Sequence, residues 1–291
     1  MSSNLSREER FRALYSHETI YMPPFEAEST ALEVCLGCSW AKCRFCDFAR
    51  DEFRINSDER IDHDLQELSE IDPECTRMFL LGENTFCLPA GKLIEIMEKA
   101  KRALPKITGF AMYARVDDIT RKTEGELRQL RDAGLDTLHI GIESGCNDVL
   151  EYVNKGITAQ DTIRETRRLD AAGIFYHVTV VLGLGGKSYS RFHALETARL
   201  INQIKAVGVW CLKLHLFEGT PLYREEKMGT FDMMTPYEIL REEYIMLKNI
   251  TAEIYFADTT VLDTYSLVGM LPDTKDQLLS SMARLLATEG Q

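Results

Sequence analysis

The stretch ALEVCLGCSWAKCRFC, residues 31–46, contains four of the eight cysteines in the chain. Its first part, ALEVCLG (31–37), is largely apolar and ends in glycine, which is typical of a buried strand that runs into a turn. The turn is followed by Cys38, Cys43 and Cys46 in a C-x4-C-x2-C arrangement. The stretch therefore predicts a strand whose carboxyl end carries a group of thiols.

The order of strand, turn and helix recurs through most of the chain. Strands that alternate with helices in this way form parallel sheets with crossover helices. The predicted fold class is therefore α/β: a partial (β/α)6 barrel of parallel strands, similar to a TIM barrel with fewer strands. After the first strand, the expected strands cover residues 78–84, 109–118, 136–145, 175–186, 208–219 and 252–260, and a last helix is expected near 273–287.

Length and composition suit one large core. The chain has 291 residues, of which 45% are hydrophobic, and no stretch rich in Pro, Gly and Ser divides it. We therefore predict a single domain over residues 1–291, with its core at about 25–260 and a C-terminal helical extension at about 261–291.

The charge balance limits the classes of partner. With 34 Lys and Arg against 46 Asp and Glu, the formal net charge is -12, which disfavours binding to nucleic-acid phosphates. The sequence contains no apolar run long enough to cross a bilayer, and its N-terminus lacks the apolar segment of a signal peptide. We therefore expect a cytoplasmic protein that binds neither membrane nor nucleic acid. In the cytoplasm thiols stay reduced, so clustered cysteines indicate metal binding or catalysis.

The cysteine spacing admits more than one metal site. Cys35 and Cys38 form a second C-x2-C pair, so four thiolates could hold a structural zinc ion. The two pairs are closer together than in a zinc ribbon, and Cys35 lies inside the apolar run, where cysteine packs as a small hydrophobic residue. We therefore expect three ligands, Cys38, Cys43 and Cys46, on an iron–sulfur cluster with one open iron. Zinc and ordinary thiols are the alternatives.

The stretch PPFEAESTALEVCLGCSWAKCRFCDF (23–48) resembles the radical S-adenosylmethionine (SAM) superfamily, in the branch related to oxygen-independent coproporphyrinogen oxidase. One subgroup has the C-x4-C-x2-C spacing with an aromatic residue before the last cysteine, here Phe45, which is placed to shield the cluster; Cys35 is a departure. The resemblance covers about residues 20–250. It implies a [4Fe–4S] cluster that binds SAM at the open iron and cleaves it to a 5′-deoxyadenosyl radical, which abstracts hydrogen from a substrate.

The resemblance also implies that residues at the strand ends hold SAM. Gly82 and Glu83, in LLGENTF, lie where the family has a Gly-Gly-Glu-like motif that receives the methionine ammonium, although only one glycine is present. Asn84 belongs to the same expected site or else caps the next helix. Arg115 is expected in the SAM pocket or in a structural salt bridge with Asp117.

Two later strand ends complete the expected SAM site. Glu143, in IGIESG, lies between apolar residues, and a buried carboxylate needs a partner or a cationic ligand. The resemblance implies that Glu143 and Lys155 hold the ribose or amino group and the carboxylate of SAM; a core ion pair is the alternative. Leu182 and Gly183, in VVLGLGG, match the family's adenine-contacting segment, where glycine lets a ligand approach the backbone.

The last strand ends are expected to contact the substrate. His215 shares a face with Phe217 and meets the substrate if that face points into the barrel, although a lone histidine is more often a core residue. Asp258 and Asp263 lie in FADTTVLDTYSLVG, where the family has a loop richer in His and Asn. This departure is expected to determine the choice of substrate.

A minimal barrel with one cysteine cluster predicts a small, enclosed substrate, and acidic late loops suit an amine-bearing compound. The chain resembles the queuine lyases, salvage enzymes of the family that cleave queuine to 7-aminomethyl-7-deazaguanine. This implies a lyase of queuosine salvage, supplied with electrons by a donor such as flavodoxin or ferredoxin. The alternatives are a radical SAM enzyme for an amino acid, a tetrapyrrole or a sugar derivative, and a non-enzymatic, zinc-stabilised α/β binding protein.

Overall fold

The computed structural model describes residues 6–48, 51–259 and 266–289, and it divides the chain into two compact units. The first comprises Met1–Ala41, Phe48–His139 and Ala172–Ile174. The second comprises Lys42–Asp47, Ile140–Ala171 and Phe175–Gln291. The segment from Cys38 to Cys46, which we call the cysteine loop, therefore begins in the first unit and continues in the second from Lys42.

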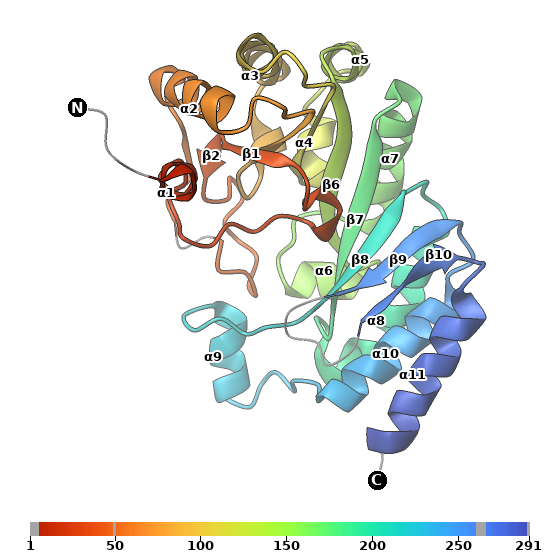
Figure 1. The fold of residues 1–291 in the computed structure, drawn as a ribbon. Coiled ribbons are helices and arrows are strands. Elements are labelled where there is room, and N and C mark those ends of the chain that lie inside the picture. Colours follow the sequence, from red (N-terminus) through yellow and green to blue (C-terminus); the bar gives the residue numbers. More distant parts are fainter. Residues whose placement is uncertain (1–5, 49–50, 260–265, 290–291) are drawn as a thin grey trace. The chain divides into compact units, whose positions relative to one another are not determined.

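Within the described residues, eight strands form a mostly parallel sheet (Figure 1). In the first unit β1, β4 and β5 are neighbours in this order, and β6 begins there. In the second unit β6 continues and is followed by β7, β8, β9 and β10. The strands are β1 Thr30–Glu33, β4 Arg77–Leu81, β5 Gly109–Ala114, β6 Leu135–Glu143, β7 Phe175–Leu182, β8 Gly208–Lys213, β9 Ile254–Asp258 and β10 Leu267–Leu271.

The strands of the first unit are buried on both faces. β1 pairs in parallel with β4, and β4 with β5, and every residue of β1 is buried. This pattern is typical of a parallel sheet covered by helices on both sides. Two further short strands, β2 (Cys35–Leu36) and β3 (Arg54–Ile55), pair antiparallel on either side of the cysteine loop.

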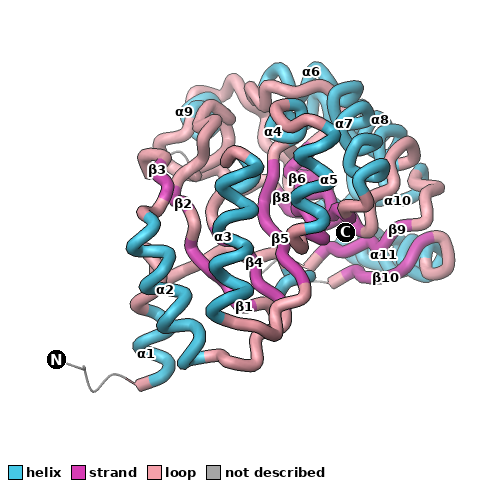
Figure 2. Tube along the Cα trace, turned by 90° about the horizontal axis from the view of Figure 1, so that it is seen from above, coloured by secondary structure: helices cyan, strands magenta, loops and turns pink. Residues whose placement is uncertain are grey.

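Helices of the first unit follow its strands, and α2 and α3 lie side by side (Figure 2). Ser57 caps α2 by accepting a hydrogen bond from the Arg60 amide. Ile61, Leu65 and Leu68 are buried at helical spacing, so one face of α2 belongs to the core. The helices are α1 Arg7–Arg12, α2 Asp58–Ile71, α3 Ala90–Ala103, α4 Val116–Thr120 and α5 Glu124–Asp132, with 3-10 turns η1 Pro24–Glu26 and η2 Thr85–Cys87.

In the second unit β7, β8 and β9 are parallel neighbours, and β10 pairs antiparallel with β9. The helix α10 packs against α8 and α11 (Figure 1). Two glutamates of α10, Glu242 and Glu243, are completely buried. The helices are α6 Asn147–Tyr152, α7 Ala159–Ala172, α8 Gly186–Ile201, α9 Pro221–Lys227, α10 Pro236–Asn249 and α11 Lys275–Glu289.

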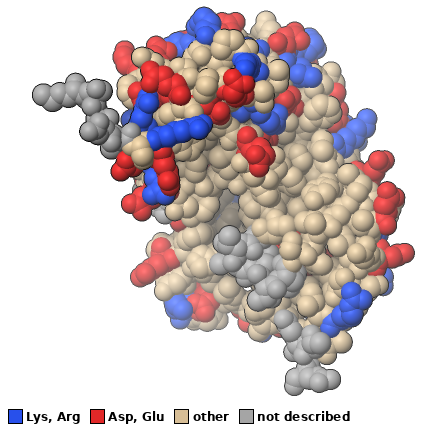
Figure 3. Space-filling view, viewed as in Figure 1, with Lys and Arg blue, Asp and Glu red and all other residues tan. Residues whose placement is uncertain are grey.

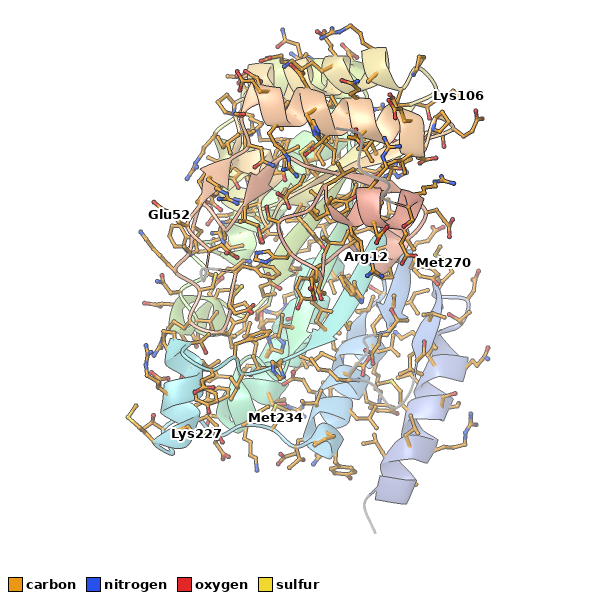
Figure 4. All side chains as sticks on the ribbon, turned by 60° about the vertical axis from the view of Figure 1, so that its left-hand side comes forward. Arg12, Glu52, Lys106, Lys227, Met234 and Met270 are labelled. Atoms are coloured by element: carbon orange, nitrogen blue, oxygen red, sulfur yellow. The ribbon has the colours of Figure 1, made fainter. Side chains whose placement is uncertain are left out.

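Charged side chains of opposite sign lie beside one another on the surface. Over α1 and α2, basic and acidic groups alternate on the face drawn in Figure 3, and Arg10 pairs there with Glu67 and Glu70. In Figure 4, Lys106 and Lys227 extend away from the ribbon; Lys227 pairs with its neighbour Glu226 at 3.1 Å. Exposed pairs of this kind add little stability. In the described part of the chain, no helix combines the length and the apolar character needed to cross a membrane.

The predicted α/β class with a mostly parallel sheet is confirmed. Each expected strand overlaps an observed one, but several expected strands are too long: β5 ends at Ala114, β7 at Leu182 and β8 at Lys213. The last helix is confirmed as α11. The strand β10 is not predicted: it lies inside the expected helical extension, and its glycine-containing run LVGML is ordered by pairing with β9. The single domain over residues 1–291 stays a prediction.

Candidate cofactor site

In the first unit the cysteine loop is anchored by a cation over an aromatic ring. The Arg115 guanidinium lies 4.9 Å from the centroid of the Trp40 ring, and Arg115 is buried. Its Nε forms an ion pair with Asp117 Oδ1 at 2.9 Å. Trp40 is partly exposed, and a contact of this kind contributes about 1 kcal/mol. The structural salt bridge expected for Arg115 is therefore present, and it fixes Trp40 two residues from Cys38.

In the second unit the other arm of the loop is anchored through Arg44. Its amide donates to the Val153 carbonyl and its carbonyl accepts from the Leu222 amide, both at 2.9 Å. Its guanidinium donates to the Tyr152 carbonyl at 2.9 Å and pairs with Glu225. Arg44 lies between Cys43 and Cys46, so this arm is held to the end of α6 and to α9.

The neighbouring Phe45 packs on an apolar cluster of the second unit that includes Val149, Leu184 and Leu214. This packing fixes the residue that separates Arg44 from Cys46. Phe45 therefore helps to hold the loop, and its expected role as a shield for the cluster stays a prediction.

The thiols of the loop differ in exposure. Cys38, Cys43 and Cys46 are partly exposed, whereas Cys35 is buried, and no disulfide joins any of the eight cysteines, all of which lie in described ranges. Burial raises the pKa of the Cys35 thiol to about 12. Metal ligands are thiolates, so Cys35 is poorly suited to be one. In the same ranges no three His, Cys, Asp or Glu side chains surround a single point as one bound ion requires.

The turn after β4 leaves a carboxylate oxygen without a donor. Gly82 has φ +153°, and a Cβ at this position would lie 2.3 Å from Cys35 Sγ and 2.8 Å from Thr85 Oγ1. Glycine is therefore required for the close approach of the chain to Cys35. The next residue, Glu83, has a buried Oε2 that accepts no hydrogen bond from the described residues. Burial raises the pKa of Glu83, because it disfavours the ionised carboxylate.

Asn84 is completely buried, and its side chain links the cysteine loop to α4. Its Nδ2 donates to Ser39 Oγ at 2.8 Å and to Asp118 Oδ2 at 2.7 Å. Asn84 occupies the N-cap position of η2, but its side chain makes no cap hydrogen bond, so the alternative role as a side-chain cap is not borne out. Both amide hydrogens are used in joining the cysteine loop to α4, which leaves Oδ1 for any further contact.

The end of β6 carries a buried ion pair. Lys155 Nζ donates to Glu143 Oε1 at 2.6 Å, and the two residues are 5% and 8% exposed. Glu143 has φ +62°, a left-handed conformation that is unusual for a residue other than glycine. A Cβ on Gly141 would lie 2.3 Å from Glu143 Oε1, so glycine makes room for the pair. The partner expected for Glu143 is present, as the core ion pair.

The end of β7 is held from α10. Leu182 is buried, and Gly183 has φ +80°. The Gly183 amide donates to Glu242 Oε1 at 2.7 Å. The turn therefore has a fixed backbone conformation, and its amide is already bonded inside the unit.

The family model described as the radical SAM superfamily matches residues 32–201, more than half of the chain. This chain belongs to the radical SAM superfamily. The match begins in β1 and ends in α8, so it includes the cysteine loop and the ends of β4, β5, β6 and β7.

Relatives in the superfamily differ in length from this chain. An uncharacterised protein of Methanocaldococcus jannaschii is 28% identical over 145 residues, which are 50% of this chain and 44% of that protein. The anaerobic magnesium-protoporphyrin IX monomethyl ester cyclase of Cereibacter sphaeroides is 27% identical over 156 residues, 52% of this chain and 25% of the cyclase. The chain thus matches less than half the length of either relative. Coproporphyrinogen III oxidase of Escherichia coli shares the fold, with a TM-score of 0.57 and 11% identity over 87% of this chain and 57% of the oxidase.

As a member of the radical SAM superfamily, the chain uses a [4Fe–4S] cluster and SAM as cofactors. The residues present fit both. Cys38, Cys43 and Cys46 keep their thiols outside disulfides, and thiolates are the ligands of such clusters. The buried Glu83 Oε2 without a donor suits the ammonium group of SAM.

The residues expected to meet the substrate lie in different settings. His215 is exposed beyond the end of β8, with its ring 4.7 Å edge-to-face from Phe217. Asp258 is completely buried, and Lys213 Nζ lies 3.2 Å from its Oδ2. Asp258 is the last residue of β9, within the strand expected over 252–260, and its charge is balanced by Lys213. Asp263 lies outside the described residues. The catalytic roles stay predictions.

The sequence does not predict three of the buried polar residues of this radical SAM chain: Ser144, His193 and Glu242. His193 gives a signal, since it lies on the buried face of α8 with Ala194, Thr197 and Ala198. A histidine on an apolar helix face needs a polar partner. Its partners cannot be found from helical periodicity, because they lie on other elements.

Proposed function

We propose that the chain is a radical SAM enzyme whose cluster is held by Cys38, Cys43 and Cys46. When bound, the cluster supplies the electron that cleaves SAM to a 5′-deoxyadenosyl radical, which abstracts a hydrogen atom from the substrate. The observation that carries the proposal is the cysteine loop, with one arm anchored by Arg115 over Trp40 and the other through Arg44. Both anchors lie between the first and the last of the three thiols, and they reduce the conformational freedom lost when the thiols become ligands.

The residues at the strand ends bind and orient SAM in this proposal. Glu83 accepts hydrogen bonds from the methionine ammonium, a role supported by its buried oxygen without a donor. Gly82 permits the turn that places Glu83 there. Glu143 and Lys155 hold the ribose or amino group and the carboxylate. Their ion pair, with Lys155 Nζ at 2.6 Å from Glu143 Oε1, keeps both side chains at the end of β6.

Other residues of the proposed site act on the remaining parts of the cofactors. Leu182 and Gly183 present backbone and apolar surface to the adenine. Arg115 and Asn84 contribute to the SAM pocket mainly by holding the cysteine loop in place. Phe45 shields the cluster from solvent.

An amine-bearing small molecule is the proposed substrate class. A cavity of the first unit, about 40 Å³ in volume, is lined by Glu33 and Glu83 and by the aromatic side chains of Tyr21, Phe48 and Tyr113. Because Glu83 receives the ammonium of SAM in this proposal, Glu33 and the three aromatic rings remain to attract the amine of the substrate. Carboxylates and aromatic faces both attract such a group.

Queuine is the specific substrate we propose, with cleavage to 7-aminomethyl-7-deazaguanine as a lyase reaction, since it carries a secondary ammonium. His215, Asp258 and Asp263 are the proposed substrate-contacting residues. A tetrapyrrole is the second candidate, favoured by the 27% identity to the magnesium-protoporphyrin cyclase. We further propose a cytoplasmic location and a flavodoxin or ferredoxin as the electron donor.

Anaerobic reconstitution with iron and sulfide tests the proposal. The expected result is a brown protein that releases 5′-deoxyadenosine when given SAM and dithionite. Cys38→Ala should lose the cluster, whereas Cys35→Ala should retain it, because Cys35 is buried and protonated. A colourless protein that retains one zinc ion would instead support a binding protein. Queuine should increase 5′-deoxyadenosine release and yield the aminomethyl base by mass spectrometry; a response to porphyrin alone would favour the second candidate.

A further inference from the structure

Three buried polar side chains of the second unit come from separate elements. Ser144 follows β6, His193 lies in α8 and Glu242 lies in α10, and each is at most 1% exposed. The ends of β6 and β7, and the helices α8 and α10, can be followed in Figure 1. Burying polar groups is unfavourable unless they satisfy one another. These three therefore require a common explanation.

The contacts form a continuous chain between two strand ends. His193 Nδ1 lies 2.8 Å from Ser144 Oγ, and Ser144 Oγ accepts a hydrogen bond from the Cys146 amide at 2.9 Å. On the other side, His193 Nε2 lies 3.6 Å from Glu242 Oε1. The same Oε1 accepts from the Gly183 amide at 2.7 Å. One imidazole thus stands between the turn after β6 and the turn after β7.

The hydrogen-bonding capacities of the groups assign the proton on the ring. Ser144 Oγ already accepts from the Cys146 amide, so its hydroxyl hydrogen is available to Nδ1, and the ring N–H belongs on Nε2, facing Glu242 Oε1. Nδ1 then accepts the Ser144 hydroxyl, whose oxygen still accepts from the Cys146 amide. Burial lowers the pKa of His193 against the opposing charge of Glu242, which favours the neutral ring. At 3.6 Å the contact between Nε2 and Oε1 is electrostatic and longer than a hydrogen bond.

Both ends of this network of polar contacts adjoin residues with a positive φ. Ser144 directly follows Glu143, which has φ +62° and pairs with Lys155. Gly183 has φ +80°. A left-handed residue that is not glycine persists only where its surroundings hold it. The polar contacts through His193 hold both turns at once.

We propose that His193 and Glu242 are positioning residues that lock the turns at Glu143 and Gly183 in one arrangement before SAM binds. The inference rests on the proposed function, in which these turns hold SAM. Neither side chain needs to touch SAM: Glu242 acts through the Gly183 amide, and His193 acts through Ser144. A site that is ordered in advance loses less freedom when the ligand binds.

A double-mutant cycle on the full, cluster-loaded chain tests the proposal, with SAM affinity measured by anaerobic calorimetry. Ser144→Ala and Glu242→Gln remove opposite partners of the His193 ring. Each should raise the Kd for SAM about tenfold, and the double variant should be no more than about tenfold weaker, because either change already releases the ring. Thr166→Val, which removes another buried hydroxyl in α7, is the matched control and should leave the Kd unchanged.

Iron content and melting temperature, measured on the same preparations, separate positioning from mere stability. Variants that melt earlier but bind SAM as tightly as the wild type would overturn the proposal, as would single effects that multiply fully in the double variant. If Glu242→Gln does not fold, His193→Gln replaces it in the cycle with the same expectation. If the wild type itself binds no SAM, the proposed function fails and this inference falls with it; equal binding by wild type and variants refutes this inference alone.

Discussion

Two glutamates at strand ends have different hydrogen-bonding environments in this protein. Glu143, the last residue of β6, receives a hydrogen bond from Lys155 at 2.6 Å, so its charge is balanced inside the protein. Glu83, after β4, has a buried Oε2 that accepts no hydrogen bond from any described residue. A glycine makes room at both places: Gly141 for the ion pair, and Gly82 for the approach of the chain to Cys35.

The difference indicates that the two glutamates have different roles, one structural and one in ligand binding. A carboxylate paired with a buried lysine is a fixed structural unit, because each group balances the charge of the other. A carboxylate with an open oxygen costs stability, and it is suited to receive an ammonium group from outside. The cost of Glu83 is in keeping with a functional role, since functional sites commonly reduce stability.

The largest loss of stability is expected from removing one partner of the ion pair between Glu143 and Lys155. Lys155→Met leaves the Glu143 carboxylate buried without its lysine, and removing one partner of a buried ion pair costs roughly 3–5 kcal/mol. Urea denaturation of the cofactor-free chain measures the free energy of unfolding. Adding Glu143→Gln to Lys155→Met should restore part of the loss, because the uncompensated charge is then gone.

The surface pair of Lys106 with Glu74 provides the control. Both side chains are more than half exposed, and Lys106→Met should change the free energy of unfolding by no more than about 0.5 kcal/mol. A loss below about 1 kcal/mol for Lys155→Met would contradict the structural importance of the buried pair.

A smaller effect is expected at the glycine beside Glu83. Gly82→Ala places a methyl group 2.3 Å from Cys35 Sγ at a φ of +153°, and overpacking of this kind costs about 1–3 kcal/mol. The same measurement of unfolding applies. Gly91→Ala in α3 is the control, because no atom lies within 4 Å of its Cβ position. That variant should be as stable as the wild type or more so, and equal losses at both glycines would argue against a special role for Gly82.

How far the sequence predicts this site depends on the distance along the chain between interacting residues. The cysteine loop is predicted because its three ligands lie within nine residues, 38–46. The pairing of Glu143 with Lys155, twelve residues away in the same segment, is given by the sequence as the alternative to a role for both in SAM binding. Glu242 is not, because it meets Gly183 from α10, 59 positions later. Only the packing of α10 on α8 brings them together.

The same reasoning explains what the sequence does not predict in the fold and at the substrate residues. Asp258 lies in an expected strand, but its partner is not predicted, because only the pairing of β9 with β8 brings Lys213 to it. The strand β10 contains a glycine and lacks strict alternation, so its pairing with β9 gives no local signal. The expected strands, by contrast, come from apolar runs that follow one another at regular spacing, which is a local property of the sequence.

The smallest expected change in the free energy of unfolding is at Glu83, and its sign is opposite to the sign expected for Glu143. Burial raises the pKa of Glu83, so the folded chain binds this proton more tightly than the unfolded chain does. Its contribution to stability therefore falls as the pH rises from the ordinary pKa of 4.5 through the raised value. Glu83→Gln removes the titration and should stabilise the cofactor-free chain at pH 7 by up to about 1 kcal/mol, with no gain below the ordinary pKa.

Glu143→Gln is the matched substitution, and it should lower stability at pH 7, because it leaves Lys155 buried without its carboxylate. Urea denaturation of both variants at pH 4 and pH 7 makes the comparison. In the cluster-loaded chain, Glu83→Gln should also weaken the binding of SAM, because an amide attracts an ammonium less strongly than a carboxylate does. Loss of stability in both variants, with SAM binding unchanged, would mean that the open oxygen of Glu83 has a partner within the protein and that the two glutamates do the same work.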